Sequence, residues 1–184
     1  MEDRSNSYIK LGELFDNTGI RSDLWIEWTH GSYNNADCCL ICKVLDKCWF
    51  LRKKMPNQPL HPHCHCRIKP ISNPVPHKNA KAICPISKFQ GYIFNPAYDD
   101  GKEALFTGMG YSIGDSEKLC REYEKQAVEK YCKGEYILAG LNCYGQSINI
   151  VIDLENNGKK KQFISGWMVR PHGLITNNTP YADA

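Results

Sequence analysis

Cysteine and histidine side chains gather in one stretch of the chain at spacings that suit a bound metal ion. Cys39 and Cys42 form a Cys-x-x-Cys pair, and Cys64 and Cys66 follow after a gap of 21 residues. Two thiolates on a tight turn can face one tetrahedral ion, and a second pair from a distant turn completes its shell. We therefore predict one structural zinc ion on these four cysteines, with His61 as the substitute for either of the last two.

Other interpretations of this stretch stay open at the level of sequence. Cys38 can replace Cys39 if the pair shifts by one residue. Six of the ten cysteines fall within residues 38–66, which is denser than reduced core thiols usually are. A disulfide framework suits a secreted chain better than this one. A catalytic zinc would need a general base such as glutamate, which the stretch lacks.

The composition is that of a soluble globular protein. Hydrophobic residues make up 42% of the chain and charged residues 23%, which is ordinary for this class, and no apolar run approaches the ~18–20 residues that cross a bilayer. The first residues are polar and lack the apolar core of a secretory signal, so we expect a cytoplasmic protein with no membrane partner. The formal net charge of +3 is too small to predict nucleic-acid binding by charge alone.

Prolines interrupt the chain between residues 70 and 81. Three of them fall within seven residues, and no apolar periodicity runs through this segment, which is typical of a semi-extended linker. We therefore predict a zinc-binding module over residues 1–69, a linker over 70–81 and a second domain over 82–184. Within the first module, a short helix is predicted over residues 7–15.

After the linker, the apolar pattern changes from a helical period to a strand period. A short helix is predicted over residues 101–106 and a longer one over 115–134, where apolar residues recur every four positions. Four strands are then predicted, over residues 135–141, 146–155, 159–169 and 174–181. An Asn-Gly pair between the second and third strands predicts a tight hairpin. The fold class is therefore α+β: a small zinc-bound module followed by two helices packed on an antiparallel four-stranded meander.

The cysteine-rich stretch resembles a known family of phage proteins. The shared features are Trp28, the Cys39 and Cys42 pair, Met55-Pro56 and the His-Pro-x-Cys-x-Cys ending at residues 61–66. Over roughly residues 25–68 the chain is similar to the zinc-binding tail of phage Mu F-like head-morphogenesis (minor capsid) proteins. The resemblance implies an origin in a phage or another mobile element.

The second domain carries a looser resemblance. Gly-Lys-x-Ala-x-Phe at residues 101–106 and Arg-Pro-His-Gly at 170–173 are similar to segments of a domain that ends phage-like and polymorphic-toxin proteins. That domain resembles the barnase/EndoU/colicin/RelE group of ribonuclease toxins. The resemblance implies RNA cleavage by attack of a 2′-hydroxyl on its own phosphate, which needs proton transfer and cations near the phosphate.

The resemblance also implies which side chains would carry that reaction. His172 would transfer the proton, and Lys102 and Arg170 would bind the phosphate. Three further residues would orient the phosphate by hydrogen bonds: Thr176, Thr179 and Tyr181. Each of these residues also has an ordinary structural interpretation, as a solvated turn residue, a surface charge or a strand residue.

Two classes of function follow from these observations. One is a phage or mobile-element effector whose C-terminal domain is a metal-independent ribonuclease acting on RNA. The other is a non-enzymatic protein-binding or inhibitor module whose sheet contacts a host or phage protein. A cleft that holds His172, Lys102 and Arg170 together favours the first class, and a buried His172 favours the second.

Overall fold

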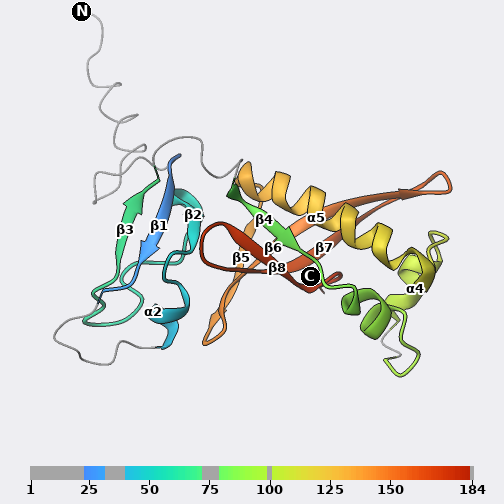
Figure 1. The fold of residues 1–184 in the computed structure, drawn as a ribbon, viewed down its shortest axis with the longest axis horizontal. Coiled ribbons are helices and arrows are strands. Elements are labelled where there is room, and N and C mark those ends of the chain that lie inside the picture. The colour runs from blue at the N-terminus through green and yellow to red at the C-terminus, as the bar shows by residue number, and fades with distance from the viewer. Residues whose placement is uncertain (1–22, 32–39, 72–78, 99–100, 183–184) are drawn as a thin grey trace, which may run out of the picture.

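Two β-sheets and the helices that pack on them make up the structure (Figure 1). The computed structural model of the chain describes residues 23–31, 40–71, 79–98 and 101–182. Within these residues, one sheet has three strands in the order β2-β1-β3 and the other has five in the order β4-β8-β7-β6-β5. The predicted α+β class is therefore confirmed. The helix predicted over residues 7–15 lies outside the described residues.

The smaller sheet carries the cysteine-rich stretch. Its central strand β1 (Trp25–Thr29) pairs antiparallel with β2 (Trp49–Leu51) and with β3 (Arg67–Pro70). Side chains alternate along β1, so Ile26 and Trp28 are buried together on one face. The short helix α2 (Leu40–Val44) and the 3-10 turn η1 (Arg52–Lys54) flank β2 in sequence.

The larger sheet contains the predicted meander and one strand more. Strands β5 (Ile137–Asn142), β6 (Gly145–Asn156), β7 (Lys159–Val169) and β8 (Leu174–Thr179) pair antiparallel in chain order. Strand β4 (Lys81–Ile83) adds to β8 in parallel, so the sheet has five strands rather than four. Three residues are too few to show a strand period, which is why the sequence pattern did not indicate β4.

The hairpin between β6 and β7 has the tight turn that the Asn-Gly pair predicts. Asn157 and Gly158 have φ angles of 50° and 72°, the left-handed values that a two-residue primed turn requires. The four aliphatic side chains that alternate along β6 are all buried, as predicted: Ile148, Ile150, Ile152 and Leu154.

The long helix α5 (Ser116–Cys132) packs on one face of this sheet (Figure 1). Its inward side chains recur at the predicted spacing, and Leu119, Tyr123, Ala127 and Tyr131 are buried. Among the described residues, no helix has the length and apolar character needed to cross a bilayer.

Aromatic side chains hold the elements at one end of α5. The π-helical turn η2 (Phe89–Ile93) and helix α4 (Lys102–Thr107) lie at the end of the large sheet that is far from the small sheet (Figure 1). Phe106 of α4 stacks on Phe163 of β7 with ring centroids 4.6 Å apart. Phe89 meets Phe106 edge-on at 5.6 Å. This cluster is the core of that end of the domain.

The other end of α5 docks on the small sheet. The hydroxyl of Tyr131 donates to the carbonyl of Trp49 at 2.5 Å, and that of Tyr136 donates to the carbonyl of Lys54 at 2.8 Å. The ring of Trp25 meets Tyr131 edge-on at 5.0 Å. These contacts join α5 and the residue that precedes β5 to the small sheet. Whether each part folds alone stays a prediction, and residues 72–78 of the predicted linker lie outside the described residues.

The turn between β7 and β8 makes a second contact with the small sheet. The backbone N–H of His172 donates to the carbonyl of Lys47 at 2.8 Å. Gly173 has a φ of 77° and passes so close to Trp49 that a Cβ at this position would lie 2.5 Å from the indole. Glycine is therefore needed here for space as well as for conformation.

Replacement of Gly173 by alanine tests this contact against a matched control. Gly158→Ala introduces the same left-handed strain, because its φ is 72°, but its Cβ would meet nothing within 4 Å. We expect Gly158→Ala to lower the free energy of unfolding by about 1–2 kcal/mol. Gly173→Ala should lower it by about 1–3 kcal/mol more, from overpacking against Trp49. Equal losses in urea unfolding would show that the turn is not tightly docked.

Truncation of the stacked phenylalanine tests the aromatic cluster. Phe106 is 0% exposed, so Phe106→Ala should lower the free energy of unfolding by about 3–5 kcal/mol. Ile113→Ala serves as the control, because Ile113 is 53% exposed and should change stability by no more than about 0.5 kcal/mol. Denaturant unfolding followed by circular dichroism measures both, and a small effect of Phe106→Ala would contradict this packing.

Candidate metal centre

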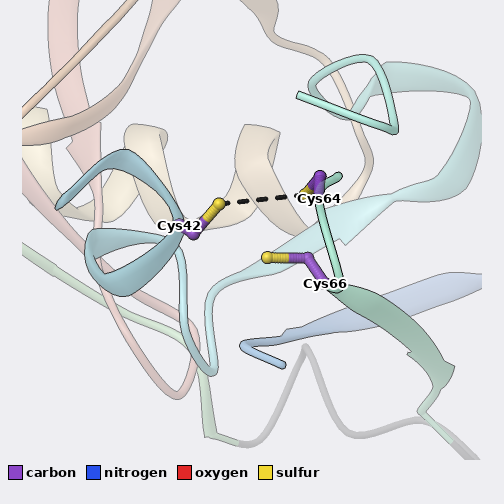
Figure 2. A group of neighbouring side chains, drawn as sticks. All are labelled: Cys42, Cys64 and Cys66. Carbon is purple, nitrogen blue, oxygen red and sulfur yellow. Dashed lines mark hydrogen bonds between the residues drawn. The ribbon is translucent and has the colours of Figure 1, made fainter. Parts of the chain in front are cut away.

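Three cysteine sulfurs converge beside the small sheet. Cys42 comes from α2, and Cys64 and Cys66 come from the segment that leads into β3 (Figure 2). All three sulfur atoms lie within 4.8 Å of one another, and the sulfurs of Cys42 and Cys64 are 3.8 Å apart. Thiolates about 2.3 Å from a tetrahedral zinc ion lie about 3.8 Å from each other. The cluster is therefore close enough to hold a metal ion.

Two tight turns present these cysteines. Cys42 is the buried residue of α2, and this helix is followed by a turn in which the N–H of Cys48 donates to the carbonyl of Leu45 at 2.9 Å. On the other side, the N–H of Cys64 donates to the carbonyl of His61 at 3.1 Å. His63 in that turn has a φ of 60°, a left-handed conformation that histidine adopts more readily than most residues. The two turns meet at the sulfur cluster.

His61 stands next to Cys42 as the predicted substitute ligand. Its Nε2 lies 3.1 Å from the sulfur of Cys42, and its Nδ1 lies 2.7 Å from the carbonyl oxygen of Pro62. A carbonyl oxygen can only accept, so Nδ1 carries the proton and Nε2 presents a lone pair. This is the tautomer in which a neutral histidine binds a metal. Cys39, the other predicted ligand, lies outside the described residues.

Hydrogen-bond donors surround the sulfur of Cys64. Burial raises the pKa of this thiol. Hydrogen bonds from the backbone N–H groups of Leu60 and Cys66 and from the thiols of Cys66 and Cys42 lower it. Together they outweigh burial, so the pKa lies below its ordinary value. Donors of this kind stabilise a thiolate, which is the form that binds metal. The environment of Cys64 therefore favours ligation.

The sulfur of Cys66 lies deeper and has donors as well. Burial raises its pKa above the ordinary value, while the indole N–H of Trp28 and the backbone N–H of Gly31 lower it in part. The indole nitrogen of Trp28 is buried and has no hydrogen-bond partner within the described part of the chain, so it remains available to donate to a thiolate at Cys66. The sequence analysis named Trp28 only as part of the resemblance and did not name Gly31, because nothing local in the chain indicates which cysteine either residue approaches.

The residues predicted to cleave RNA do not form one site. Arg170 lies beside Thr176, with Nε 3.4 Å from the threonine hydroxyl, and donates to the carbonyl of Tyr144 at 2.9 Å. His172 is exposed in the neighbouring turn, with a φ of 61°. These three predicted residues therefore lie at the end of the large sheet that meets the small sheet.

Lys102 lies at the opposite end. It begins α4, and its ammonium donates to the hydroxyl of Tyr92 at 2.6 Å. Helix α4 packs on Phe163, which precedes Val169 by six residues along β7, a separation of about 20 Å at the usual rise of a strand. The structure therefore does not bring Lys102 together with Arg170 and His172.

The remaining predicted phosphate ligands are also held by local contacts. The hydroxyl of Thr179 donates to the carbonyl of Tyr181 at 2.7 Å. The ring of Tyr181 meets Phe163 edge-on at 6.1 Å. Thr179 shares a surface hollow with Tyr92 and Lys88, so it and Tyr181 lie nearer the Lys102 end of the sheet than the His172 end.

Comparisons with known proteins do not assign a family or a function to this chain. The resemblances to phage head-morphogenesis proteins and to ribonuclease toxins therefore stay predictions, and each role proposed below rests on contacts within the chain. No protein-family model matches the sequence, and searches among curated proteins and among solved structures find no match either.

Proposed function

We propose that Cys42, His61, Cys64 and Cys66 bind one zinc ion that has a structural role. The spacing of the three sulfurs, with 3.8 Å between those of Cys42 and Cys64, is the observation that carries this proposal. Sulfur-rich tetrahedral sets select zinc or iron–sulfur centres over magnesium and calcium. If His61 completes the set, four protein ligands would leave no position for a reacting water, and the ion would have a structural role.

The ion would hold together a module with little core of its own. The small sheet has strands of only three to five residues, and so small a unit usually needs a metal or disulfides. In zinc-finger peptides, a structural zinc contributes about 10–16 kcal/mol of apparent binding free energy. By fixing α2 against the turn at 61–64, the ion would also fix Lys47, which accepts the hydrogen bond from His172.

Loss of one ligand should remove the metal. We expect purified wild-type protein to contain about one equivalent of zinc and Cys64→Ser to contain well under half an equivalent. Three of the four tryptophans, Trp25, Trp28 and Trp49, lie in the small sheet, so tryptophan fluorescence should shift to the red as this module opens. Cys143→Ser is the control, because Cys143 is exposed in the turn between β5 and β6 and should keep the full zinc content.

The identity of the fourth ligand follows from the same experiment with cobalt. Cobalt(II) in a site of three sulfurs and one nitrogen has visible bands at shorter wavelength than in a four-sulfur site, because imidazole is the stronger-field ligand. His61→Ala should change this spectrum, and Cys39→Ala should leave it unchanged. The reverse pattern would assign the fourth position to Cys39. Wild-type protein that binds neither zinc nor cobalt would contradict the proposal altogether.

For the C-terminal domain, the free edge of β5 favours protein binding over RNA cleavage. Among the residues that the structure describes, β5 pairs only with β6. It carries no charged residue, and its Ile137 is 70% exposed. Natural edge strands usually carry charges that prevent pairing with another chain. Tyr144, in the turn that follows β5, is also 70% exposed. The edge therefore suits an extended segment of a partner protein that adds as a further strand.

In the middle of β5 the strand pairing is irregular, but the backbone carbonyls there have hydrogen-bond partners. The pairing register shifts between Leu138 and Leu141, and the side-chain amide of buried Gln146 donates to the carbonyls of Ala139 at 3.2 Å and Gly140 at 3.4 Å. Added pairing would therefore begin at Ile137 and Leu138. That this partner is a host or phage protein stays a prediction, which only the resemblance implies.

A library of extended peptides tests this edge directly. We expect peptides selected on the wild-type chain to have apolar residues at alternating positions and to lose at least tenfold in affinity on Ile137→Lys, about 1.4 kcal/mol. Ile113→Lys is the control at an exposed isoleucine of η3 (Ile113–Asp115) and should leave affinity unchanged. Cleavage of RNA by the purified wild type that His172→Ala abolishes would instead favour the ribonuclease.

A further inference from the structure

The end of β1 lies between the two halves of the candidate metal centre. The strand order β2-β1-β3 places β1 in the middle of the small sheet. The chain that carries Cys42 leads into β2, whereas the chain that carries Cys64 and Cys66 leads into β3 (Figure 2). The residues at the end of β1 and just after it, 28–31, therefore contact both halves and set the separation between them.

Hydrogen bonds hold this end of β1 to the chain that follows α2. The backbone N–H of His30 donates to the carboxylate of Asp46 at 2.8 Å. The N–H of Lys47 donates to the carbonyl of Trp28 at 2.7 Å, and the N–H of Trp28 donates to the carbonyl of Cys48 at 2.8 Å. The helix that carries the first cluster sulfur is thus joined to β1 by bonds that involve no sulfur atom.

The other half of the centre approaches β1 so closely that there is no room for a side chain. A Cβ on Gly31 would overlap the carbonyl oxygen of His65 and would lie 2.6 Å from its carbonyl carbon. Real Cβ atoms essentially never come this close to a backbone atom, so His65 can keep its position only if residue 31 is glycine. Since His65 lies between Cys64 and Cys66, a shift of its backbone would move both of these cysteines.

The separation of the sulfurs suits a small ion. The sulfurs of Cys42 and Cys64 are 3.8 Å apart, which is the edge of a tetrahedron whose metal–sulfur bonds are about 2.3 Å long, as they are for zinc. A larger ion that also prefers sulfur, such as cadmium, forms longer bonds and needs a wider set of ligands. Because geometry contributes to the selection of metals by proteins, ligands that are held at this separation disfavour the larger ion.

We propose that the end of β1 is a spacer, in which Gly31 and Asp46 set the size of the metal site and raise its preference for zinc over a larger thiophilic ion. This inference rests on the metal binding proposed above. Gly31 and Asp46 are positioning residues, because they act on the chain segments that carry the ligands. A methyl group at Gly31 would push His65 away from β1 and widen the site. Loss of the acceptor at Asp46 would release β1 from the chain that follows α2.

The affinities of the full chain for zinc and for cadmium test the spacer. The protein is stripped of metal under reducing conditions, and each ion is then titrated in competition with a chromophoric chelator. Gly31→Ala should lower the zinc affinity by about 10–100-fold, as changes around metal ligands usually do, and should lower the cadmium affinity by less. The ratio of zinc to cadmium affinity should therefore fall.

Gly140→Ala is the matched control for this substitution. A Cβ on Gly140 would meet nothing within 4 Å, and neither Gly140 nor Gly31 has a φ in the left-handed region. The two variants therefore differ in the close approach to His65 and not in backbone strain. Gly140→Ala should leave both metal affinities unchanged, and a fall in the ratio for this variant as well would contradict the assignment to Gly31.

Asp46 gives a second test that does not depend on the folding of Gly31→Ala. Asp46→Ala removes the acceptor of the N–H of His30 and should lower the ratio of zinc to cadmium affinity. Asp46→Asn keeps an oxygen that can accept this hydrogen bond and should retain the wild-type ratio. An equal fall for the alanine and asparagine variants would contradict the role of the hydrogen bond.

The ratio also separates a spacer from a purely structural role. Equal losses of zinc and cadmium affinity would show that Gly31 and Asp46 only stabilise the fold, and this result would overturn the inference. Variants that bind both ions as the wild type does would overturn it too. A wild-type chain that binds no metal would instead contradict the proposed function, so the two failures are distinguishable.

Discussion

Two tyrosine hydroxyls near the C-terminal end of α5 connect the small sheet to the large one. Tyr131 and Tyr136 are both fully enclosed, and burial raises the pKa of each phenol, so they remain donors wherever the protein is folded. They donate to the carbonyls of Trp49 and Lys54, and the loss of a hydrogen bond of this kind costs about 0.5–1.5 kcal/mol. The placement of the candidate metal centre relative to the large sheet depends on this contact.

One segment of the chain contributes both to the candidate metal centre and to the contacts between the small sheet and the rest of the protein. Residues 42–49 contribute a cluster sulfur at Cys42, the carbonyl of Lys47 that accepts from His172, and the carbonyl of Trp49 that accepts from Tyr131. A metal ion at Cys42 would therefore restrain the chain that both contacts need. In this arrangement the ion supports assembly of the fold, which is what a structural site does.

The strand order of the large sheet places its edges and ends in different surroundings. Within the described residues its two edges are β4 and β5, and β5 presents the exposed side chain of Ile137. Its two ends are also different, because the β7–β8 turn meets the small sheet while α4 packs beside the β6–β7 hairpin. Lys102 and His172 therefore belong to different ends, and a shared catalytic role would need a rearrangement of the whole sheet. Binding at an edge needs none.

The sequence by itself determined the features that depend on neighbouring residues. The spacing of Leu119, Tyr123 and Tyr131 predicted α5, alternation predicted β6, and the Asn157-Gly158 pair predicted its hairpin, since backbone period and turn geometry are local properties. The clustering of cysteines likewise indicated a metal site. Only the tertiary structure decided the pairings between distant segments: β4 beside β8, Cys42 beside Cys64, the N–H of Cys84 on Glu124, and Lys102 away from His172. These pairings depend on how buried faces pack together. Residues that meet across a core are far apart in the sequence, and no local pattern indicates that they will be in contact.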